Sequence, residues 1–474
     1  MNKVCLPLFL MLSYNTINAQ EFLNLGFEYG VYNAQPRKWM IEGEALSYTA
    51  NLDSQLSKQG TKSLFVNLNK GSVYSYLMLP GKDVAGKRVK GEGYARFKGA
   101  DSIKLILAFR DPAGKTVTSS PVSAKQDNWI NVQHEMQVSN EYTSDRFLIA
   151  VVAMGSGKYW LDDFTITLNG NPYGINAPNF REPTTDELSV LNKNVINLDA
   201  INNRESIISL IGSSRIVALG ENSHGSATIL RYKLDLIKLL VEKAGFSVFA
   251  LECPKANAEV VNGYVSNDTV DRQQAIQNLV YPSWQKQEIM DIIEWIKTYN
   301  QKSDSKVQFK GFDINPGDSQ DTRETELAKN IDSIMRQSDE IKMIVSGDNS
   351  HVTKASGKMG AFVTEKYGGK YLNIGFTFQS GQYSAYGKEK VYIVHPAYIG
   401  TYEYFLSKSK YKNFILDLRK MKDLPILMKT SGFRSIGSRP QEVTQFQETE
   451  ILKQFDVIVN LEKSVPTTNL VRDN

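Results

Sequence analysis

The segment GENSHG, residues 220–225, places a carboxylate and an imidazole three residues apart, at Glu221 and His224. A histidine with an ordinary pKa of about 6.5 can take a proton from water at neutral pH. A carboxylate beside it can orient the ring and stabilise its charged form. Such a pair suits attack of water on an activated carbonyl without a covalent intermediate. The residues alone leave a second interpretation open, in which these polar side chains only cap the helix that follows.

The flanking residues predict a strand, a turn and a helix that together position this pair. Ile216–Leu219 is a short, mostly β-branched run that is typical of a buried strand. Ser226–Ala244 carries apolar residues on one helical face. Glu221 and His224 then lie at the carboxyl end of a strand, where ligands bind in open α/β sheets. Arg231, early in the helix, is either a ligand for an oxyanion or carboxylate or a residue of a solvated helix face.

Polar residues also follow three other predicted strands. They are Glu252 after Ser247–Leu251, Asp313 after Val307–Phe312, and Asp348 and His351 after Lys342–Val345. Because parallel strands end at the same edge of a sheet, these carboxylates and imidazoles are expected to converge there, as in an active site. Asp313 is expected to support this site rather than to react.

Several other chemistries lack their sequence motifs. The chain has no GxxxxGK[ST] or GxGxxG turn for a nucleotide and no GxSxG nucleophile elbow. It has no HExxH motif and no Cys/His spacing typical of zinc. We therefore expect no metal and no cofactor, and the residues predict a site built on a base and carboxylates.

The chain of 474 residues predicts two or three domains, and its net charge of +4 is small for this length. No basic block indicates nucleic acid, and no apolar run reaches the roughly 18 residues of a membrane span. Residues 1–19 combine Lys3, the apolar run VCLPLFLML and a small residue, Ala19, before a cleavage position. This pattern predicts a signal peptide and a secreted or periplasmic protein. Cleavage leaves Cys253 as the only cysteine, so no internal disulfide is expected.

The pattern along the chain changes at about residue 170. Residues 20–170 contain short alternating runs such as KSLFVNLN, SIKLILAFR and RFLIAVVAM, which predict an all-β sandwich. Residues 171–190, rich in proline, glycine and asparagine, predict a linker. Residues 191–474 alternate between helical and strand patterns, which predicts a mostly parallel sheet with helices on both faces.

Two resemblances to known families follow from longer motifs. Residues 198–466 resemble the erythromycin esterase family through GENSHGSATILRYKLDLIKLLVEKAGFSVFALE, FKGFDIN, GDNSHVTK and FDVIVNLEKSVPT. This resemblance implies a three-layer α/β/α domain that hydrolyses an ester, in the best-known members a macrolide lactone, and hence a link to antibiotic response. It implies that His224 is the general base for water, that Glu221 and Glu252 support it, and that no metal is required. Residues 20–170 resemble the jelly-roll modules found beside carbohydrate-active enzymes, which implies glycan contact; Trp39, Trp129 and Trp160 are either core residues or sugar-stacking residues.

Two positions depart from the family pattern. Where the family has His-Asn-x-His, this chain has Asp348 in place of the first histidine, and Thr228 replaces an acid found in many members. An aspartate donates to a leaving alkoxide only when it is protonated, so His351 carries more of the chemistry, the substrate differs, or activity is weak. Three hypotheses remain: an exported, metal-independent hydrolase of a small-molecule ester or lactone, a non-catalytic ligand-binding homologue, and a glycan-associated hydrolase acting on a glycoside.

Overall fold

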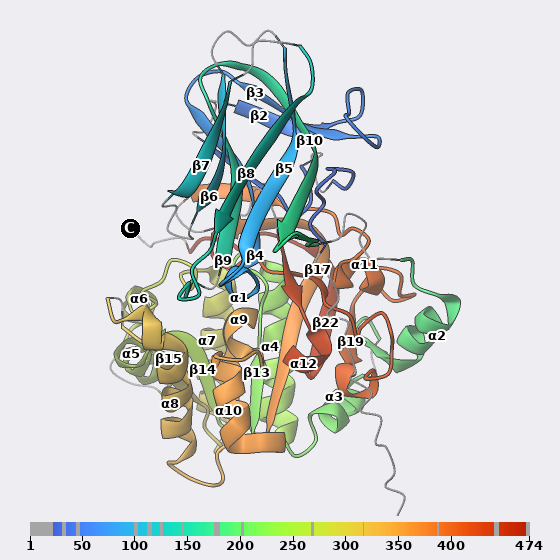
Figure 1. Ribbon diagram of the computed structural model, residues 1–474. Coiled ribbons are helices and arrows are strands. Elements are labelled where there is room, and N and C mark those ends of the chain that lie inside the picture. Colours follow the sequence, from blue (N-terminus) through green and yellow to red (C-terminus); the bar gives the residue numbers. More distant parts are fainter. Residues whose placement is uncertain are drawn as a thin grey trace, which may run out of the picture. The chain divides into compact units, whose positions relative to one another are not determined.

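The structure of the protein is a computed structural model. It describes residues 22–30, 35–43, 48–98, 103–110, 116–123, 127–144, 146–174, 181–200, 203–266, 270–315, 317–385, 388–439 and 445–470. The chain divides into two units, Met1–Asn179 and Phe180–Asn474, which are described separately below (Figure 1). The predicted signal peptide, residues 1–19, lies outside the described residues.

The first unit is a sandwich of two antiparallel sheets. Its elements are β1 (Met40–Gly43), β2 (Tyr48–Asp53), β3 (Ser63–Leu68), β4 (Ser72–Pro80), α1 (Gly81–Val84), β5 (Arg88–Lys98), β6 (Lys104–Arg110), β7 (Thr116–Ser123), β8 (Ile130–Gln137), β9 (Arg146–Met154), β10 (Gly157–Leu168) and β11 (Asn171–Pro172). One sheet has the order β1-β4-β9-β6-β7 and the other β2-β3-β10-β5-β8, with β11 beside β10. Alternate residues such as Val73, Leu77 and Leu79 of β4 enter the shared core. The predicted all-β sandwich is confirmed.

The tryptophans of this unit differ in burial. Trp39 is buried against Phe27 and Phe164, and the buried Trp160 donates its indole N–H to Asp53 over 2.8 Å. Trp129 is half-buried.

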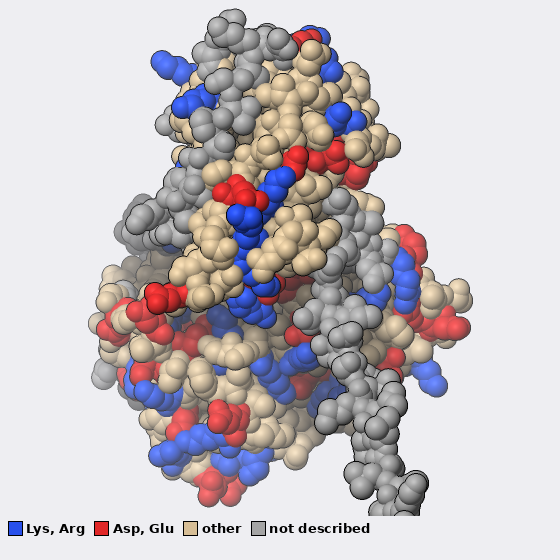
Figure 2. All heavy atoms as spheres, viewed as in Figure 1, with Lys and Arg blue, Asp and Glu red and all other residues tan. Residues whose placement is uncertain are grey.

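Charged side chains of both signs run along the outer face of the β2-β3-β10-β5-β8 sheet (Figure 2). They include the ion pairs Arg88–Glu135 and Lys90–Glu92. The polar alternate residues of β5 and β8 therefore lie on the face of the sheet that points away from the core.

The second unit alternates helices and strands. Its elements are α2 (Thr185–Asn194), β12 (Val195–Asn197), α3 (Arg204–Ile211), β13 (Ile216–Leu219), α4 (Ala227–Ala244), β14 (Val248–Pro254), α5 (Lys255–Ser266), α6 (Arg272–Gln277), α7 (Gln287–Lys302), β15 (Gln308–Asp313), η2 (Gln320–Thr322), α8 (Arg323–Met335), β16 (Met343–Ser346), α9 (Asn349–Val352), α10 (Met359–Tyr367), η3 (Gly368–Lys370), β17 (Tyr371–Ala385), β18 (Lys388–Ile393), α11 (Tyr402–Leu406), β19 (Phe414–Asp417), η4 (Leu418–Lys420), β20 (Ser431–Arg434), β21 (Phe446–Thr449), α12 (Ile451–Gln454) and β22 (Val457–Ser464).

The main sheet of this unit has the order β12-β19-β22-β17-β13-β16-β14-β15. The strands from β22 to β15 pair in parallel, and β19 is antiparallel to both of its neighbours. Val217 and Leu219 of β13 enter a core with α3, α4, α5 and α7, while Ile216 and Ala218 enter a second core with α2, α8, α10 and α11. Both faces of the sheet are therefore covered, and the predicted three-layer α/β/α fold with a mostly parallel sheet is confirmed.

The sheet order places the end of β16 between the ends of β13 and β14. The chain segment after β16 contains Asp348, so this residue lies between the segments that carry Glu221 and Glu252. Among the helices of the described ranges, none combines the length and apolar character needed to cross a membrane.

Candidate active site

The turn between β13 and α4 holds Glu221 and His224 in direct contact. The Glu221 carboxylate is fully buried and lies 2.5 Å from Nδ1 of His224. The backbone of the turn is fixed from outside, since His224 N–H donates to the Gly437 carbonyl. At Gly225 a Cβ would lie 1.7 Å from the Ser384 carbonyl oxygen, so only glycine fits after the histidine. The predicted carboxylate–imidazole pair thus exists in a turn with little freedom to move.

A buried lysine holds the second oxygen of the Glu221 carboxylate. Lys233 of α4 has no exposed surface, and its Nζ donates to Glu221 over 2.6 Å and to the Ser346 hydroxyl over 3.1 Å. The ammonium charge and the two hydrogen bonds compensate for burying the Glu221 carboxylate, which is needed because an unpaired buried charge is very costly. Burial alone raises the pKa of Glu221, but Lys233 and His224 hold it below its usual value. Glu221 is therefore an anion with a fixed orientation.

The other ring nitrogen of His224 faces a second carboxylate. Nε2 lies 3.7 Å from Oδ2 of Asp348, and the ring packs edge-on against Trp284 with centroids 4.9 Å apart. Burial lowers the pKa of His224, but the hydrogen bond and charge of Glu221, helped by Glu252 and Asp348, raise it to about 9. The free protein therefore holds a mostly protonated His224 at neutral pH.

Glu252 and Asp313, from the ends of β14 and β15, share one guanidinium. Arg323 donates to both oxygens of Asp313 over 2.9 and 2.8 Å and to Glu252 over 2.9 Å. The second oxygen of Glu252 accepts the Asp348 backbone N–H over 2.9 Å. Burial raises the pKa of Glu252, but His351, His224 and Arg323 hold it well below its usual range. Glu252 thus links the turn after β16 to the end of its own strand, β14, and through Arg323 to the end of β15.

His351 completes this group in a second histidine–carboxylate–lysine arrangement. Its Nδ1 lies 3.0 Å from Glu324, which also accepts from Lys358 over 3.0 Å. Nε2 lies 3.4 Å from Glu252 and 3.1 Å from Nη1 of Arg323. Burial lowers the pKa of His351, but Glu252 and Glu324 raise it to about 10. A protonated Nε2 cannot accept from Arg323, so in that form its proton points to Glu252.

The structure brings six of the seven predicted site residues together and leaves Arg231 outside. Glu221, His224, Glu252, Asp313, Asp348 and His351 are linked through the contacts above. The Arg231 side chain is 62% exposed and faces Glu288 at 3.4 Å instead. The Thr228 hydroxyl accepts the Val465 backbone N–H. Among the described residues, no group of three or more His, Cys, Asp or Glu side chains is arranged to hold a metal ion.

Sequence reasoning missed the cations of this site. Lys233 carried a usable signal, because it lies three residues after Leu230 and three before Leu236, both on the buried face of α4. Arg323 and Lys358 carried none, since each reaches its partner across a long sequence separation.

These features define a layered α/β/α domain with an imidazole–carboxylate site at the carboxyl edge of its parallel strands. The sequence model of the erythromycin esterase family matches residues 241–322 and 315–464. These matches lie in the C-terminal unit and support its assignment to the erythromycin esterase family.

Individual relatives match parts of the chain. Erythromycin esterase type II of Escherichia coli is 30% identical over 107 residues, 22% of this chain and 25% of that protein. The putative hydrolase YbfO of Bacillus subtilis is 31% identical over 107 residues, 22% of this chain and 23% of that protein. This chain thus spans about a quarter of the length of these curated relatives.

Solved structures are similar to each unit. The crystal structure of a succinoglycan biosynthesis protein is 21% identical and has a TM-score of 0.53, covering 60% of this chain and 98% of that chain, which supports the fold. A xylan-binding domain from Paenibacillus barcinonensis is 22% identical and covers 32% of this chain and 96% of that domain, with a TM-score of 0.24.

The Lys233–Glu221 contact predicts a large loss of stability when the lysine is removed. In Lys233→Ala the Glu221 carboxylate stays buried without its main counter-charge, which costs about 3–5 kcal/mol in the free energy of unfolding. Urea unfolding of the full chain measures this loss. Lys243→Ala, at an exposed position of the same helix, is the control and should cost about 0.5 kcal/mol or less. Equal losses in the two variants would show that the buried pair contributes no more to the free energy of unfolding than an exposed lysine does.

Proposed function

We propose that the C-terminal unit hydrolyses a small-molecule carboxylic ester or lactone with His224 as general base for the attacking water. The observation that carries this proposal is the 2.5 Å contact between Glu221 and Nδ1 of His224, which leaves Nε2 to act on water. Membership of the erythromycin esterase family supports the same reaction class. The substrate beyond an ester or lactone is not assigned by fold or family alone.

The ring of His224 and the carboxylate of Asp348 are close enough to hydrogen-bond the same water molecule. Nε2 and Oδ2 are 3.7 Å apart, so one water can donate one proton to each. Transfer of the first proton to Nε2 leaves the oxygen free to attack the ester carbonyl carbon. The imidazolium then returns the proton to the leaving alkoxide as the acyl C–O bond breaks, and the acid is released. Glu221 stabilises the imidazolium throughout these steps.

The Asp348 substitution changes which residue can donate protons. In this site Asp348 accepts from water, while a protonated His351 and the guanidinium of Arg323 are the cationic donors beside Glu252. We infer that these two cations stabilise the negative charge that develops on the carbonyl oxygen. Asp348 thereby replaces the family's first imidazole with a hydrogen-bond acceptor. Hydrogen-bond donation to the substrate then comes from His351 and Arg323.

The general-base role predicts that His224→Ala removes most of the activity while the protein stays folded. General-base assistance is typically worth roughly 10²- to 10⁴-fold in rate. The measurement is release of acid from a panel of aryl esters and lactones, with thermal unfolding as the check on folding. His134→Ala, which removes a half-buried imidazole from β8 in the other unit, is the matched control and should keep the full rate.

Two results would decide against this reaction. Hydrolysis by His224→Ala at the rate of the unmodified protein would refute water activation by this residue. Absence of hydrolysis in the unmodified protein, together with saturable binding of the same esters, would favour the non-catalytic homologue.

The raised pKa of His224 predicts a basic pH profile. Only the neutral ring can take a proton, and a pKa of about 9 leaves roughly 1% of the ring neutral at pH 7. The kcat/KM value should therefore rise about tenfold per pH unit from pH 6.5 to 8.5 and level above about pH 9. Asp348→Asn removes a charge that stabilises the imidazolium, so its profile should level at a lower pH. A flat profile between pH 6 and 9 would contradict this assignment.

We also propose that the protein is exported and that its N-terminal unit contacts glycan. The signal-like residues 1–19 support export. Tyr74 and Tyr76 lie half-buried on the same outer face of β4, and the Arg110 guanidinium lies 4.9 Å from the Tyr74 ring centre. Such rings can stack on sugars. N-terminal sequencing of the exported protein should give Gln20 as the first residue.

Tyr74→Ala should weaken retention of the full chain on an insoluble polysaccharide. Retention by no polysaccharide would reduce the unit to a spacer.

A further inference from the structure

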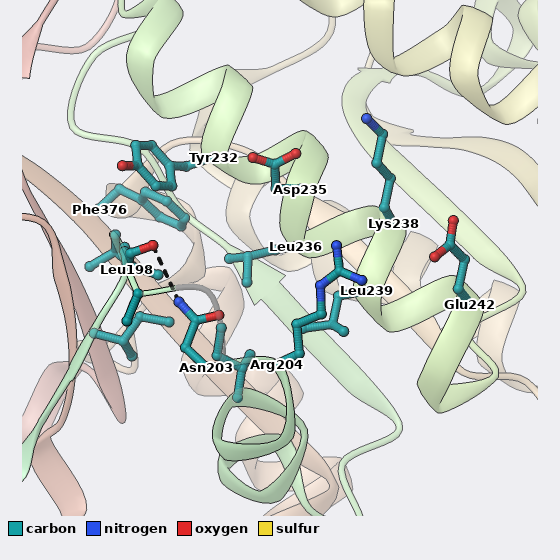
Figure 3. Close-up of a pocket in the computed structure, with 14 residues that line it drawn as sticks. Leu198, Asn203, Arg204, Tyr232, Asp235, Leu236, Lys238, Leu239, Glu242 and Phe376 are labelled. Atoms are coloured by element: carbon teal, nitrogen blue, oxygen red, sulfur yellow. Dashed lines mark hydrogen bonds between the residues drawn. The ribbon is translucent and has the colours of Figure 1, made fainter.

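A cavity of about 470 Å³ lies in the C-terminal unit among α3, α4 and the main sheet (Figure 3). None of the residues that line it belongs to the candidate active site. Its size is within the range of about 300–1,000 Å³ that is usual for small-molecule sites. The fold therefore contains a second concave site that the proposed hydrolysis does not use.

The inner surface of the cavity is apolar. Leu236 and Leu239 of α4, Ile207 of α3 and Phe376 of β17 line it, and all four side chains are buried. Because α4 rises about 1.5 Å per residue, the ten steps from Tyr232 to Glu242 make the part of the helix that lines the cavity about 15 Å long. An elongated apolar body of a ligand fits such a surface.

The rim carries charges without partners. Within the described part of the chain, Arg204, Asp235, Lys238 and Glu242 line the cavity and take part in no ion pair. Figure 3 shows Tyr232, Asp235, Lys238 and Glu242 in this order along α4, with Asp235 between Tyr232 and Lys238. Lys238, Glu242 and Arg204 together carry charges of both signs. The end of the cavity at Tyr232 carries an aromatic ring and a carboxylate instead.

The Tyr232 end is aromatic and negative. Tyr232 and Asp235 are three residues apart on α4 and so lie on the same side of the helix. Burial raises the pKa of the Tyr232 phenol, and the charges of Asp199 and Asp235 raise it further. Asp199 is hydrogen-bonded to Asn413, and Asp235 has no counter-ion among the described residues. An aromatic ring beside uncompensated carboxylates attracts an organic cation.

We propose that this cavity binds an amphipathic ligand whose ammonium group lies at Tyr232 and Asp235 and whose apolar body lies along Leu236, Leu239 and Phe376. The site is separate from the catalytic turn, so the proposal stands whether or not the C-terminal unit hydrolyses esters. An anionic amphiphile is disfavoured at the Tyr232 end, because the Asp235 carboxylate would repel its head group.

Calorimetric titration of the full chain with three probes tests the ligand class. Octyltrimethylammonium carries the cation and the apolar chain, tetramethylammonium carries only the cation, and octanoate carries the same chain length with the opposite charge. The first probe should bind at least about tenfold more tightly than each of the others. Equal or tighter binding of octanoate, or no saturable binding of octyltrimethylammonium, would overturn the proposal.

Variants locate the binding. Asp235→Asn should weaken octyltrimethylammonium roughly fivefold, as expected for loss of one partly exposed charge pair. Glu242→Gln, the matched loss of a carboxylate at the other end of the cavity, should change the affinity less than about twofold. Equal effects of the two variants would refute a head-group site at Tyr232. His224→Ala should leave the affinity unchanged; if it abolishes binding, the probe occupies the catalytic turn instead and the proposal fails.

Discussion

The fully buried ammonium group of Lys233 is the constraint on which the candidate site depends. A lysine without exposed surface is tolerated only where its charge and its hydrogen bonds are satisfied, and here Glu221 and Ser346 supply both. Ser346 ends β16 and Glu221 follows β13, so one side chain of α4 connects the ends of two adjacent strands. With Glu221 held by Lys233, its remaining oxygen has one direction available, towards His224.

Much of the C-terminal unit could be predicted because its local signals agree with its fold. Ile216 and Val217 are both apolar since the two faces of the sheet are both covered. The helix predicted at Ser226–Ala244 is α4, Ala227–Ala244, with Ser226 as its N-cap. The meeting of Glu221 and His224 followed from their place after a strand, since three residues are enough to return a side chain within one tight turn.

The remainder depends on the order of the strands in the sheet, which local patterns do not encode. β16 is later in the chain than β14 and β15, yet it lies next to β13. This order makes Asp348, rather than Glu252, the carboxylate nearest to Nε2 of His224. The position of a side chain around the helix axis matters in the same way. Arg231 and Lys233 are two residues apart, so about 200° of rotation separates them, and one points to solvent and the other into the site.

The pairing of each site carboxylate with a cation has a consequence for product release. In the resting protein the four carboxylates Glu221, Glu252, Asp313 and Asp348 are balanced by four cations: Lys233, Arg323 and the protonated His224 and His351. The reactive form has lost the proton of His224 and therefore holds one uncompensated negative charge. In the proposed reaction, a neutral ester becomes a carboxylate beside this site. At pH values above about 9, where His224 stays neutral, electrostatic repulsion favours release of that carboxylate, so inhibition by the product should weaken as the pH rises.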